Sequence, residues 1–261
     1  MMAMALAACG PRTNGAVSEV KPRDEATAES AYVASPSLTT AVRQAGGRIT
    51  LTGRAQPGAH VRLATPAGDS IFAKADVAGV WRAVLPASGV MRLFGLSMSE
   101  GQRTVQAEGY LAIAPDGRAA QLRSGAGAVV LGVPPRTLRI LAVDFDNLGE
   151  ADKLRAAVVS GAAAPGATVS VVIDGVQRQA VADADGRFMA LNEPLAAGVH
   201  TLETAQDGSR VRLLLPIVHA PPLTPGPFRA ERTDLGWRID WMTPGGGVQS
   251  TLLVDKAEGS T

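Results

Sequence analysis

The sequence contains little cysteine, few aromatic residues, almost no net charge and no long hydrophobic run. Cys9 is its single cysteine among 261 residues, so the chain cannot form an internal disulfide. Lys and Arg number 25 against 24 Asp and Glu, a formal net charge of +1, so no large electrostatic field is available to attract nucleic acid. Every apolar run is shorter than the roughly 18 to 20 residues that cross a bilayer as a helix, and no segment of this sequence is expected to be a transmembrane helix.

Small apolar residues and turn formers are abundant instead. Hydrophobic residues make up 46% of the chain with aromatics at only 4%, and there are 29 glycines and 17 prolines. Short strands separated by Gly and Pro turns, around small-residue cores, are typical of all-β proteins. The length of 261 residues suits two ordinary domains, or one large domain with appendages.

The first residues, MMAMALAACG, place Cys9 after a short apolar stretch. Leu6-Ala7-Ala8-Cys9 resembles the lipobox of bacterial lipoproteins, and this resemblance implies that the Cys9 thiol receives a diacylglycerol. Residues 1–9 would then be the remnant of a lipoprotein signal, and the missing basic segment indicates that translation starts upstream. Gly10 follows the cysteine in place of an aspartate, which for lipoproteins implies the outer membrane. The alternative is that Cys9 is an incidental residue of a tail.

Residues 10–46 are expected to form a disordered tether. This stretch mixes Pro, Ser, Thr, Ala and charged residues with almost no apolar periodicity, so it cannot bury enough surface to offset the entropy of ordering. Together with a lipid on Cys9, the tether would hold a folded body away from the membrane, on the periplasmic side of the outer membrane or at the cell surface.

An internal repeat organises the rest of the chain. The stretch GRAQPGAHVRLATPAGDSIFAKADVAGVWRAVLP begins at Gly53, and GAAAPGATVSVVIDGVQRQAVADADGRFMALNEP begins at Gly161. One residue of slippage aligns the two copies. The matching turn residues and aromatic core anchors are Pro57, Gly58, Asp76, Gly79 and Trp81 in the first copy and Pro165, Gly166, Asp183, Gly186 and Phe188 in the second.

Each copy predicts strands joined by tight turns. Proline fixes φ and glycine accepts a positive φ at the PGA turn, and alternating apolar residues such as Val169 and Val171 follow. The order of strand, PGA, strand, hairpin and AD-x-x-G-x-W/F resembles the bacterial immunoglobulin-like (Ig-like) repeats of surface and envelope proteins. This resemblance implies two tandem Ig-like antiparallel β-sandwich domains, which serve as spacers or interaction modules without catalysis.

The predicted Ig-like domains are 47–133 and 136–218, with the stiff pair Pro134-Pro135 between them. The first domain carries an apolar insertion after Pro86. The insertion predicts a loop or short helix that covers one end of its own sandwich, or alternatively a protein-binding patch. In the second case Phe94 and Met98 would contact a partner.

A Pro-rich connector and a C-terminal β-hairpin are predicted for 219–261. Trp237, Ile239 and Trp241 alternate onto one face of a strand, with two charged residues on the other. An isolated hairpin is marginally stable, so this one must pack on a sandwich or on another protein. Trp237 and Trp241 are therefore candidate interaction residues.

No residue pattern predicts catalysis, a bound metal or a cofactor. GLSMSEG lacks the last glycine of a G-x-S-x-G elbow, and the histidines are not at metal-ligand spacing. ADADGRF, residues 182–188, places Asp183 and Asp185 beside Gly186 as a calcium loop does, but the further oxygen donors and the glutamate of such a loop do not follow. Because the sibling stretch ADVAGVW has Ala78 where Asp185 stands, a hairpin turn is the preferred interpretation.

Two functions are consistent with these patterns. The first is a non-catalytic structural or scaffolding lipoprotein, anchored in the membrane through Cys9, that binds other envelope proteins by sheet-edge or hairpin contacts. The second is a glycan-binding envelope protein directed at peptidoglycan or an exported polysaccharide, which would expose Trp237 and Trp241 in a groove. Neither function involves nucleic acid, a cofactor or a metal.

Overall fold

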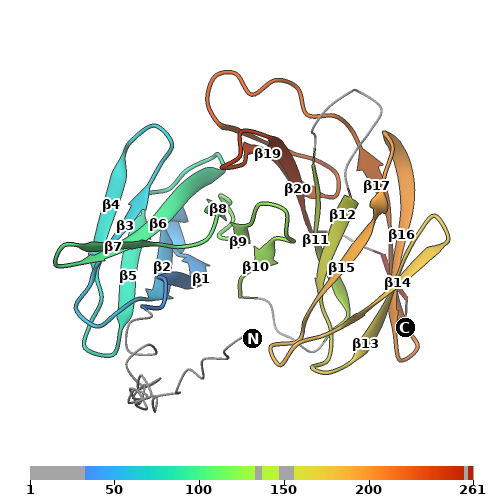
Figure 1. Cartoon of the computed structure of the whole chain (residues 1–261), viewed down its shortest axis with the longest axis horizontal. Helices are drawn as coiled ribbons and strands as arrows, with labels where there is room; N and C mark the ends of the chain where they lie inside the picture. Colours follow the sequence, from blue (N-terminus) through green and yellow to red (C-terminus); the bar gives the residue numbers. More distant parts are fainter. Residues whose placement is uncertain (1–32, 133–136, 147–155, 256–257, 261) are drawn as a thin grey trace, which may run out of the picture. The chain divides into compact units, whose positions relative to one another are not determined.

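The computed structural model describes residues 33–132, 137–146, 156–255 and 258–260, and these residues form an all-β protein (Figure 1). Their strands make four antiparallel sheets, and a single 3-10 turn spans Ala45–Gly47. The predicted all-β class is therefore confirmed. Among the described residues, no helix has the length and hydropathy of a membrane span.

Sheets I and II form the first sandwich. Sheet I has the order β1-β2-β5, and sheet II has the order β10-β9-β8-β6-β3-β4, with β7 paired to β6. The strands of sheet I are β1 (Ser37–Arg43), β2 (Ile49–Arg54) and β5 (Val80–Leu85). The strands of sheet II are β3 (His60–Ala64), β4 (Ser70–Lys74), β6 (Arg92–Glu100), β7 (Arg103–Gln106), β8 (Tyr110–Ile113), β9 (Ala119–Leu122) and β10 (Val129–Val130). Alternate residues are buried, including Leu51 and Trp81 from sheet I and Val61 and Leu63 from sheet II.

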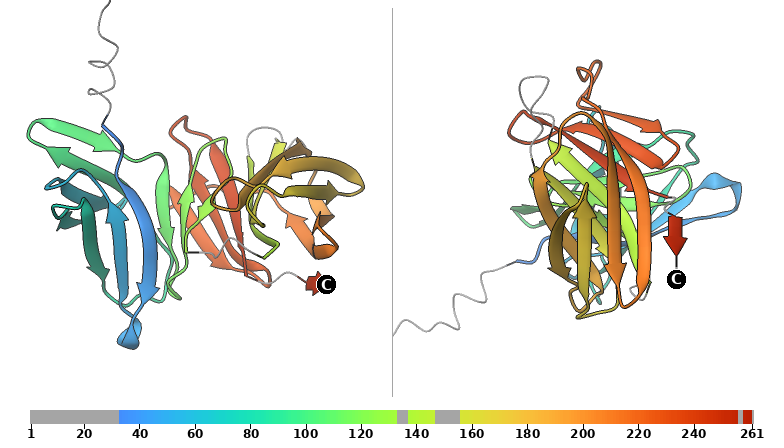
Figure 2. Two further views of the ribbon diagram at one scale, coloured as in Figure 1. Left: turned by 90° about the horizontal axis from the view of Figure 1, so that it is seen from below. Right: turned by 90° about the vertical axis from the view of Figure 1, so that its right-hand side faces the viewer.

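Sheets III and IV form the second sandwich (Figure 2). Sheet III has the order β15-β12-β11-β20-β19-β18, and sheet IV has the order β14-β13-β16-β17-β21. The strands of sheet III are β11 (Arg139–Asp146), β12 (Ala156–Ala162), β15 (Arg187–Pro194), β18 (Phe228–Arg232), β19 (Gly236–Met242) and β20 (Val248–Val254). The strands of sheet IV are β13 (Thr168–Ile173), β14 (Val176–Val181), β16 (Gly198–Gln206), β17 (Ser209–Ile217) and β21 (Glu258–Ser260).

The internal repeat appears as matching strand pairs. Gly53 on β2 pairs with Trp81 on β5, and Gly161 on β12 pairs with Phe188 on β15. A Cβ on Gly53 would lie 2.4 Å from the Trp81 ring, and one on Gly161 would lie 2.2 Å from the Phe188 ring. Each aromatic anchor thus lies against a glycine, and a larger residue there would displace the ring.

Sheet III is buried on both faces. On one face, Phe145 and Leu252 belong to the core shared with sheet IV. On the other face, Leu141, Trp241 and Leu253 belong to a second core, shared with β6, β8, β9 and β10 of sheet II. Because β20 pairs with both β11 and β19, the predicted C-terminal hairpin packs within the chain, at the centre of a sheet.

Polar contacts reinforce the junction between sheets II and III. The Gly125 N–H donates to the Gln249 side-chain carbonyl at 3.1 Å, and the Gln249 amide donates to the Arg123 carbonyl at 3.2 Å. Arg118, in the β8–β9 turn, forms an ion pair with Asp255 just after β20. The two sandwiches therefore meet through an apolar core with polar contacts beside it.

Two segment predictions are wrong. Residues 37–43 of the expected tether form β1, because Leu38 is buried and the strand pairs with β2 along its length. The insertion after Pro86 forms β6 and β7 in place of a loop or short helix, because Leu96 and Met98 alternate with serines and pack into the sandwich. The predicted linker Pro134-Pro135, the rest of the tether up to residue 32 and Cys9 lie outside the described residues.

Candidate functional site

The paired turns of the repeat have the same hydrogen bonds. Asp183 Oδ1 accepts from the N–H groups two and four residues on, at 2.9 and 2.8 Å, and Asp76 Oδ1 accepts the same two bonds at 2.9 Å each. Gly79 and Gly186 complete these turns with φ of 74° and 69°. The carboxylate of ADADGRF thus closes a hairpin, and the described residues contain no group of three or more His, Cys, Asp and Glu side chains that could hold a metal ion.

The PGA turns also match. Gly58 and Gly166 have φ of 78° and 75°, and their N–H groups donate to the carbonyls of Ala75 and Ala182 at 3.2 and 3.0 Å. Pro57 and Pro165 precede them in the chain. These hydrogen bonds tie each PGA turn to the strand end that leads into the Asp turn, so the turn residues of one copy act together as a structural unit.

The four candidate interaction residues are mostly interior. Trp241, Phe94 and Met98 are 0%, 1% and 3% exposed, and Trp237 is half-buried under the Arg232 guanidinium, 5.6 Å from its ring centroid. Trp241 makes an edge-to-face contact with Tyr110 of β8, with centroids 5.7 Å apart. Trp241, Phe94 and Met98 therefore anchor the protein's own core, and a contact between them and a partner is excluded.

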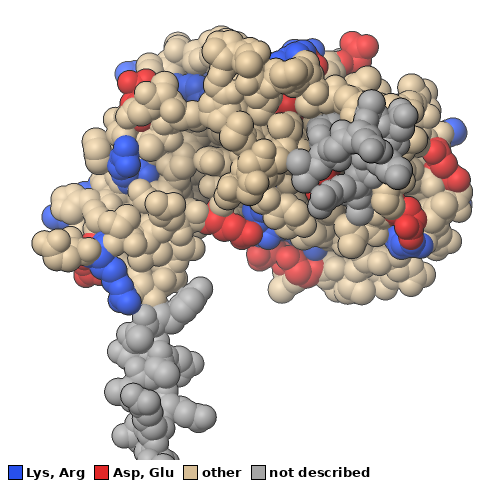
Figure 3. Space-filling model, turned by 45° about the horizontal axis from the view of Figure 1, so that its top comes forward, with Lys and Arg blue, Asp and Glu red and all other residues tan. Residues whose placement is uncertain are grey.

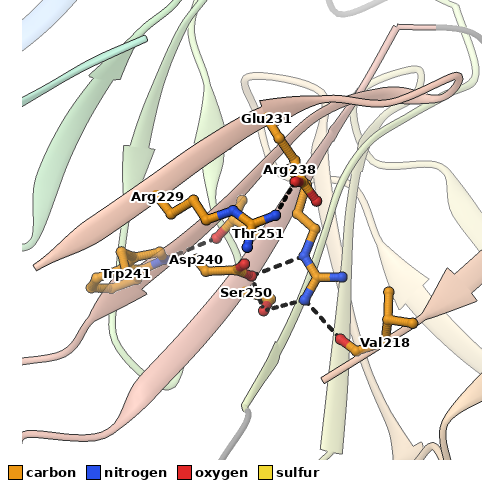
Figure 4. A network of polar contacts seen from close by, with 8 residues as sticks. All are labelled: Val218, Arg229, Glu231, Arg238, Asp240, Trp241, Ser250 and Thr251. Carbon is orange, nitrogen blue, oxygen red and sulfur yellow. Dashed lines mark hydrogen bonds and ion pairs between the residues drawn. The ribbon is translucent and has the colours of Figure 1, made fainter. Parts of the chain in front are cut away.

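A charged pair is buried on the face of sheet III that points toward sheet IV (Figure 4). Arg238 Nε donates to Asp240 Oδ1 at 2.9 Å, and the Ser250 hydroxyl donates to the same oxygen at 2.6 Å. Arg238 also donates to the Val218 carbonyl at 2.7 Å and lies 5.8 Å from the Phe145 ring centroid. This network ties β19 and β20 to the segment that follows β17.

A second network lies on the opposite face of sheet III. The Thr251 hydroxyl donates to Asp144 Oδ1 at 2.5 Å and accepts from the Trp241 indole at 3.1 Å. The Ala128 N–H donates to Asp144 Oδ2 at 2.7 Å. Burial nevertheless dominates and raises the pKa of Asp144 from 3.8 to about 6, despite opposing hydrogen bonds from Thr251, Ala128 and Gln249. Asp144 thereby fastens β20 and the β9–β10 turn to β11.

One histidine forms a pair with a carboxylate that resembles part of a catalytic relay. His200 Nδ1 lies 2.6 Å from Asp174 Oδ2, and His200 Nε2 lies 2.9 Å from the Ala196 carbonyl. The Thr201 N–H bond and the His200 contact lower the pKa of Asp174. Since His200 Nε2 faces a backbone carbonyl and not a hydroxyl or thiol, the pair lacks the nucleophile of a catalytic relay, and it anchors a turn.

A cleft of about 370 Å³ lies where the β9–β10 turn meets β12 and β15. Its cationic groups are engaged: Arg123 donates twice to the Gly127 carbonyl, at 3.1 and 2.9 Å, and Arg187 pairs with Asp185 at 3.3 Å. No nucleophile–base pair lies among its lining residues. The cleft geometry therefore does not supply a catalytic constellation.

The surface carries charges of both signs in small groups among uncharged residues, as the face in Figure 3 shows. Several large apolar side chains are also exposed among the described residues, and those on the outer faces of sheets II and IV include Phe72, Val199 and Leu214. Val199 and Leu214 on the outer face of sheet IV are 69% and 58% exposed, and Phe72 on the outer face of sheet II is 70% exposed. These are apolar side chains that the two sandwiches do not use in their cores.

Sequence patterns carried signals for some of these residues. The runs ILAV in β11 and TLLV in β20 do not alternate, which indicates burial on both faces. Arg238 and Asp240, two residues apart in an otherwise apolar strand, suit a buried pair. In SIFAK, alternation places Phe72 with Ser70 and Lys74, away from the core.

No known protein-family model matches the chain, and no curated protein sequence matches it. One similar solved structure is described as "Ca2+-stabilized adhesin helps an Antarctic bacterium reach out and bind ice". It is 12% identical, the match covers 85% of this chain and 66% of that chain, and the TM-score is 0.23. This chain thus spans just under two thirds of that chain, and a TM-score this low supports no argument about fold or role.

Proposed function

We propose that the protein is a non-catalytic structural or scaffolding lipoprotein of the bacterial cell envelope that binds another envelope protein. An exposed apolar patch on sheet IV carries this proposal. Val199 lies opposite Pro216, and Leu214 lies two residues before Pro216 on the same face, followed by Val218. Single exposed apolar residues are ordinary, but three exposed aliphatic side chains beside an exposed proline are typical of a protein contact.

The use of polar groups inside the protein supports a non-catalytic role. Asp144, Arg238 and Asp240 are the buried ionisable residues of sheet III, and each is hydrogen-bonded to a neighbouring strand or segment. Buried charges that hold strands together stabilise one arrangement of the chain. The result is a body suited to presenting a surface, with the lipobox-like stretch at Cys9 as its proposed membrane attachment.

A site-specific photo-crosslinker tests the protein contact in whole cells. Placed at Leu214, it is expected to give a discrete protein adduct, and Val199→Glu in the same chain should reduce that adduct because it puts a charge in the patch. The matched control position is Gln179, which is exposed on the same face of sheet IV. No adduct at Leu214, or equal adducts at both positions, would contradict the proposal.

Lipid attachment has a separate test. Cells expressing the protein are fed a clickable fatty acid, and the wild type is compared with Cys9→Ser. Label on the wild type alone is expected if Cys9 carries the diacylglycerol. An unlabelled wild type would overturn the anchor and the envelope location with it.

The glycan-binding alternative needs a different surface from the one the tryptophans suggested. Trp241 is fully buried and Trp237 is half-buried under Arg232, so these two rings do not form an open platform for sugars.

A further inference from the structure

The outer face of sheet II carries an exposed aromatic ring among polar side chains. Phe72 on β4 pairs with Arg62 on β3, which pairs with Ser97 on β6. Ser97 in turn pairs with Gln106 on β7. Because paired residues of antiparallel strands lie on the same face, a ring, a guanidinium, a hydroxyl and an amide form one row across four strands.

A second polar row runs beside the first. Lys74 pairs with His60, His60 with Ser99, and Ser99 with Thr104. Lys74, His60 and Thr104 are exposed, as are Arg62 and Gln106 in the first row. Neither row contains Asp or Glu, so two permanent cations face solvent here without a carboxylate in either row.

The second repeat shows which of these side chains the fold requires. Its corresponding row is Gln179, Ser170 and Ala205, on β14, β13 and β16. The same strands thus form with no ring and no guanidinium at these positions. Since Phe72 is mostly exposed to water, it gains little from burial, and its presence is explained by a ligand better than by the sandwich.

A sugar chain suits the geometry of this face. The apolar C–H face of a sugar ring packs on an aromatic ring, while its hydroxyls hydrogen-bond to hydroxyl, amide and guanidinium groups. Arg62 and Lys74 favour a sugar that carries carboxylates, because a guanidinium binds a carboxylate through two parallel hydrogen bonds. A protein partner would instead cover a cluster of apolar anchors, whereas the neighbours of Phe72 in its row and on its face of β4 are polar.

We infer that the outer face of sheet II binds a carboxylate-bearing polysaccharide, with Phe72 against a sugar ring and Arg62 and Lys74 pairing with its carboxylates. The site is separate from the proposed protein contact, since that contact lies on sheet IV. Peptidoglycan and acidic exported polysaccharides share this chemistry.

Affinity electrophoresis and co-sedimentation test the inference with the purified full chain. Migration is measured in gels containing polygalacturonate or neutral dextran, and sedimentation is measured with purified peptidoglycan. Retardation by polygalacturonate, sedimentation with peptidoglycan, or both are expected, with no retardation by dextran and weaker binding at high salt. The arm that responds identifies the source of the carboxylates.

The variants follow the second repeat. Phe72→Gln and Arg62→Ser introduce the residues found at the corresponding positions, Gln179 and Ser170, so folding should be preserved and is checked by thermal unfolding. Each is expected to weaken binding about tenfold. Leu214→Gln, on the outer face of sheet IV, is the matched control and should bind as the wild type does.

Three outcomes would overturn the inference: no binding to either acidic polymer, equal retardation by dextran, or unchanged binding by folded Phe72→Gln and Arg62→Ser. The crosslink from position 214 is measured in Phe72→Gln as well. Its persistence when glycan binding is lost would show that the two surfaces act independently, so one proposal can fail while the other stands.

Discussion

At the scale of single residues, Asp144 links the stability of the protein to pH. Its carboxylate accepts hydrogen bonds from the Thr251 and Gln249 side chains of β20 and from the N–H of Ala128, and these bonds favour the ionised form. Complete burial opposes them and prevails, so the pKa stands near 6. At neutral pH the folded protein therefore holds an ionised carboxylate in an unfavourable buried site. The oxygens of that carboxylate accept the hydrogen bonds that join β11 to β20 and to the β9–β10 turn.

The contribution of Asp144 to the free energy of unfolding should fall as pH rises from about 4 to 7. The folded state binds the Asp144 proton more tightly than the unfolded chain does, where the pKa is near 3.8, so protonation stabilises the fold. Over this range the loss from Asp144 alone is about 2–3 kcal/mol. The unfolding free energy is measured in urea at pH 4 and at pH 7.5. Between these two pH values, Asp144→Asn should lose less unfolding free energy than the wild type, by the amount that Asp144 contributes. Equal losses in the two proteins would contradict the raised pKa of Asp144.

The local turns are the part of the structure that short-range sequence patterns could predict. Asp76 and Asp183 hydrogen-bond to N–H groups within four residues, so the information lies in the stretch itself. The partner of Asp144 could not be found in this way. Thr251 lies 107 residues away, and nothing in the local pattern of either strand specifies the other.

At the scale of elements, strands β19 and β20 convert an ordinary sandwich sheet into a layer with two buried faces. Among the described residues, β1 of sheet I pairs with β2 alone, whereas the corresponding β11 of sheet III pairs with both β12 and β20. The added strands bring the Arg238–Asp240 pair with them. A buried pair of this kind holds its strand in one register, because a slip by one residue would move both charges to the opposite face.

Breaking the pair should cost more than removing it. Arg238→Met leaves Asp240 buried without its cation, and the expected loss is about 3–5 kcal/mol of unfolding free energy. The double variant Arg238→Met/Asp240→Leu removes both charges and should recover most of that loss. Chemical denaturation of the wild type, both single variants and the double variant completes the cycle. A double variant no more stable than Arg238→Met would refute the role assigned to the pair.

At the scale of the whole molecule, the described sandwiches share a core. Trp241 and Leu253 pack with side chains of β8, β9 and β10, and Arg118 pairs with Asp255 across the same junction. The sequence repeat indicates two similar units. It does not show that the strands after the first copy, β8 to β10, pack against the strands after the second copy, β19 and β20, and so join the two units. That information is spread over Tyr110, Leu122, Trp241 and other residues that are far apart in the chain.

A shared core predicts that both sandwiches unfold together. In a Trp237→Phe background, Trp241→Ala leaves Trp81 in the first sandwich as the only tryptophan. Losing the buried Trp241 ring should lower the free energy of unfolding by about 3–5 kcal/mol. The unfolding midpoint that Trp81 fluorescence reports should therefore be lower than in the control variant Trp237→Phe/Trp241→Phe, which keeps an aromatic ring at position 241. An unchanged Trp81 transition would show that the sandwiches unfold independently.

The position of β20 in the chain also sets the order of events during synthesis. Strand β11 ends at Asp146, but β20, which pairs with one of its edges, begins only at Val248. During synthesis that edge of β11 therefore stays unpaired until about a hundred further residues have been added. Until Val254 has emerged from the ribosome, both layers that cover sheet III lack part of the surface they pack on. The β11 edge of sheet III therefore stays open until β20 has been made, and any product truncated before 248 keeps that unpaired edge permanently.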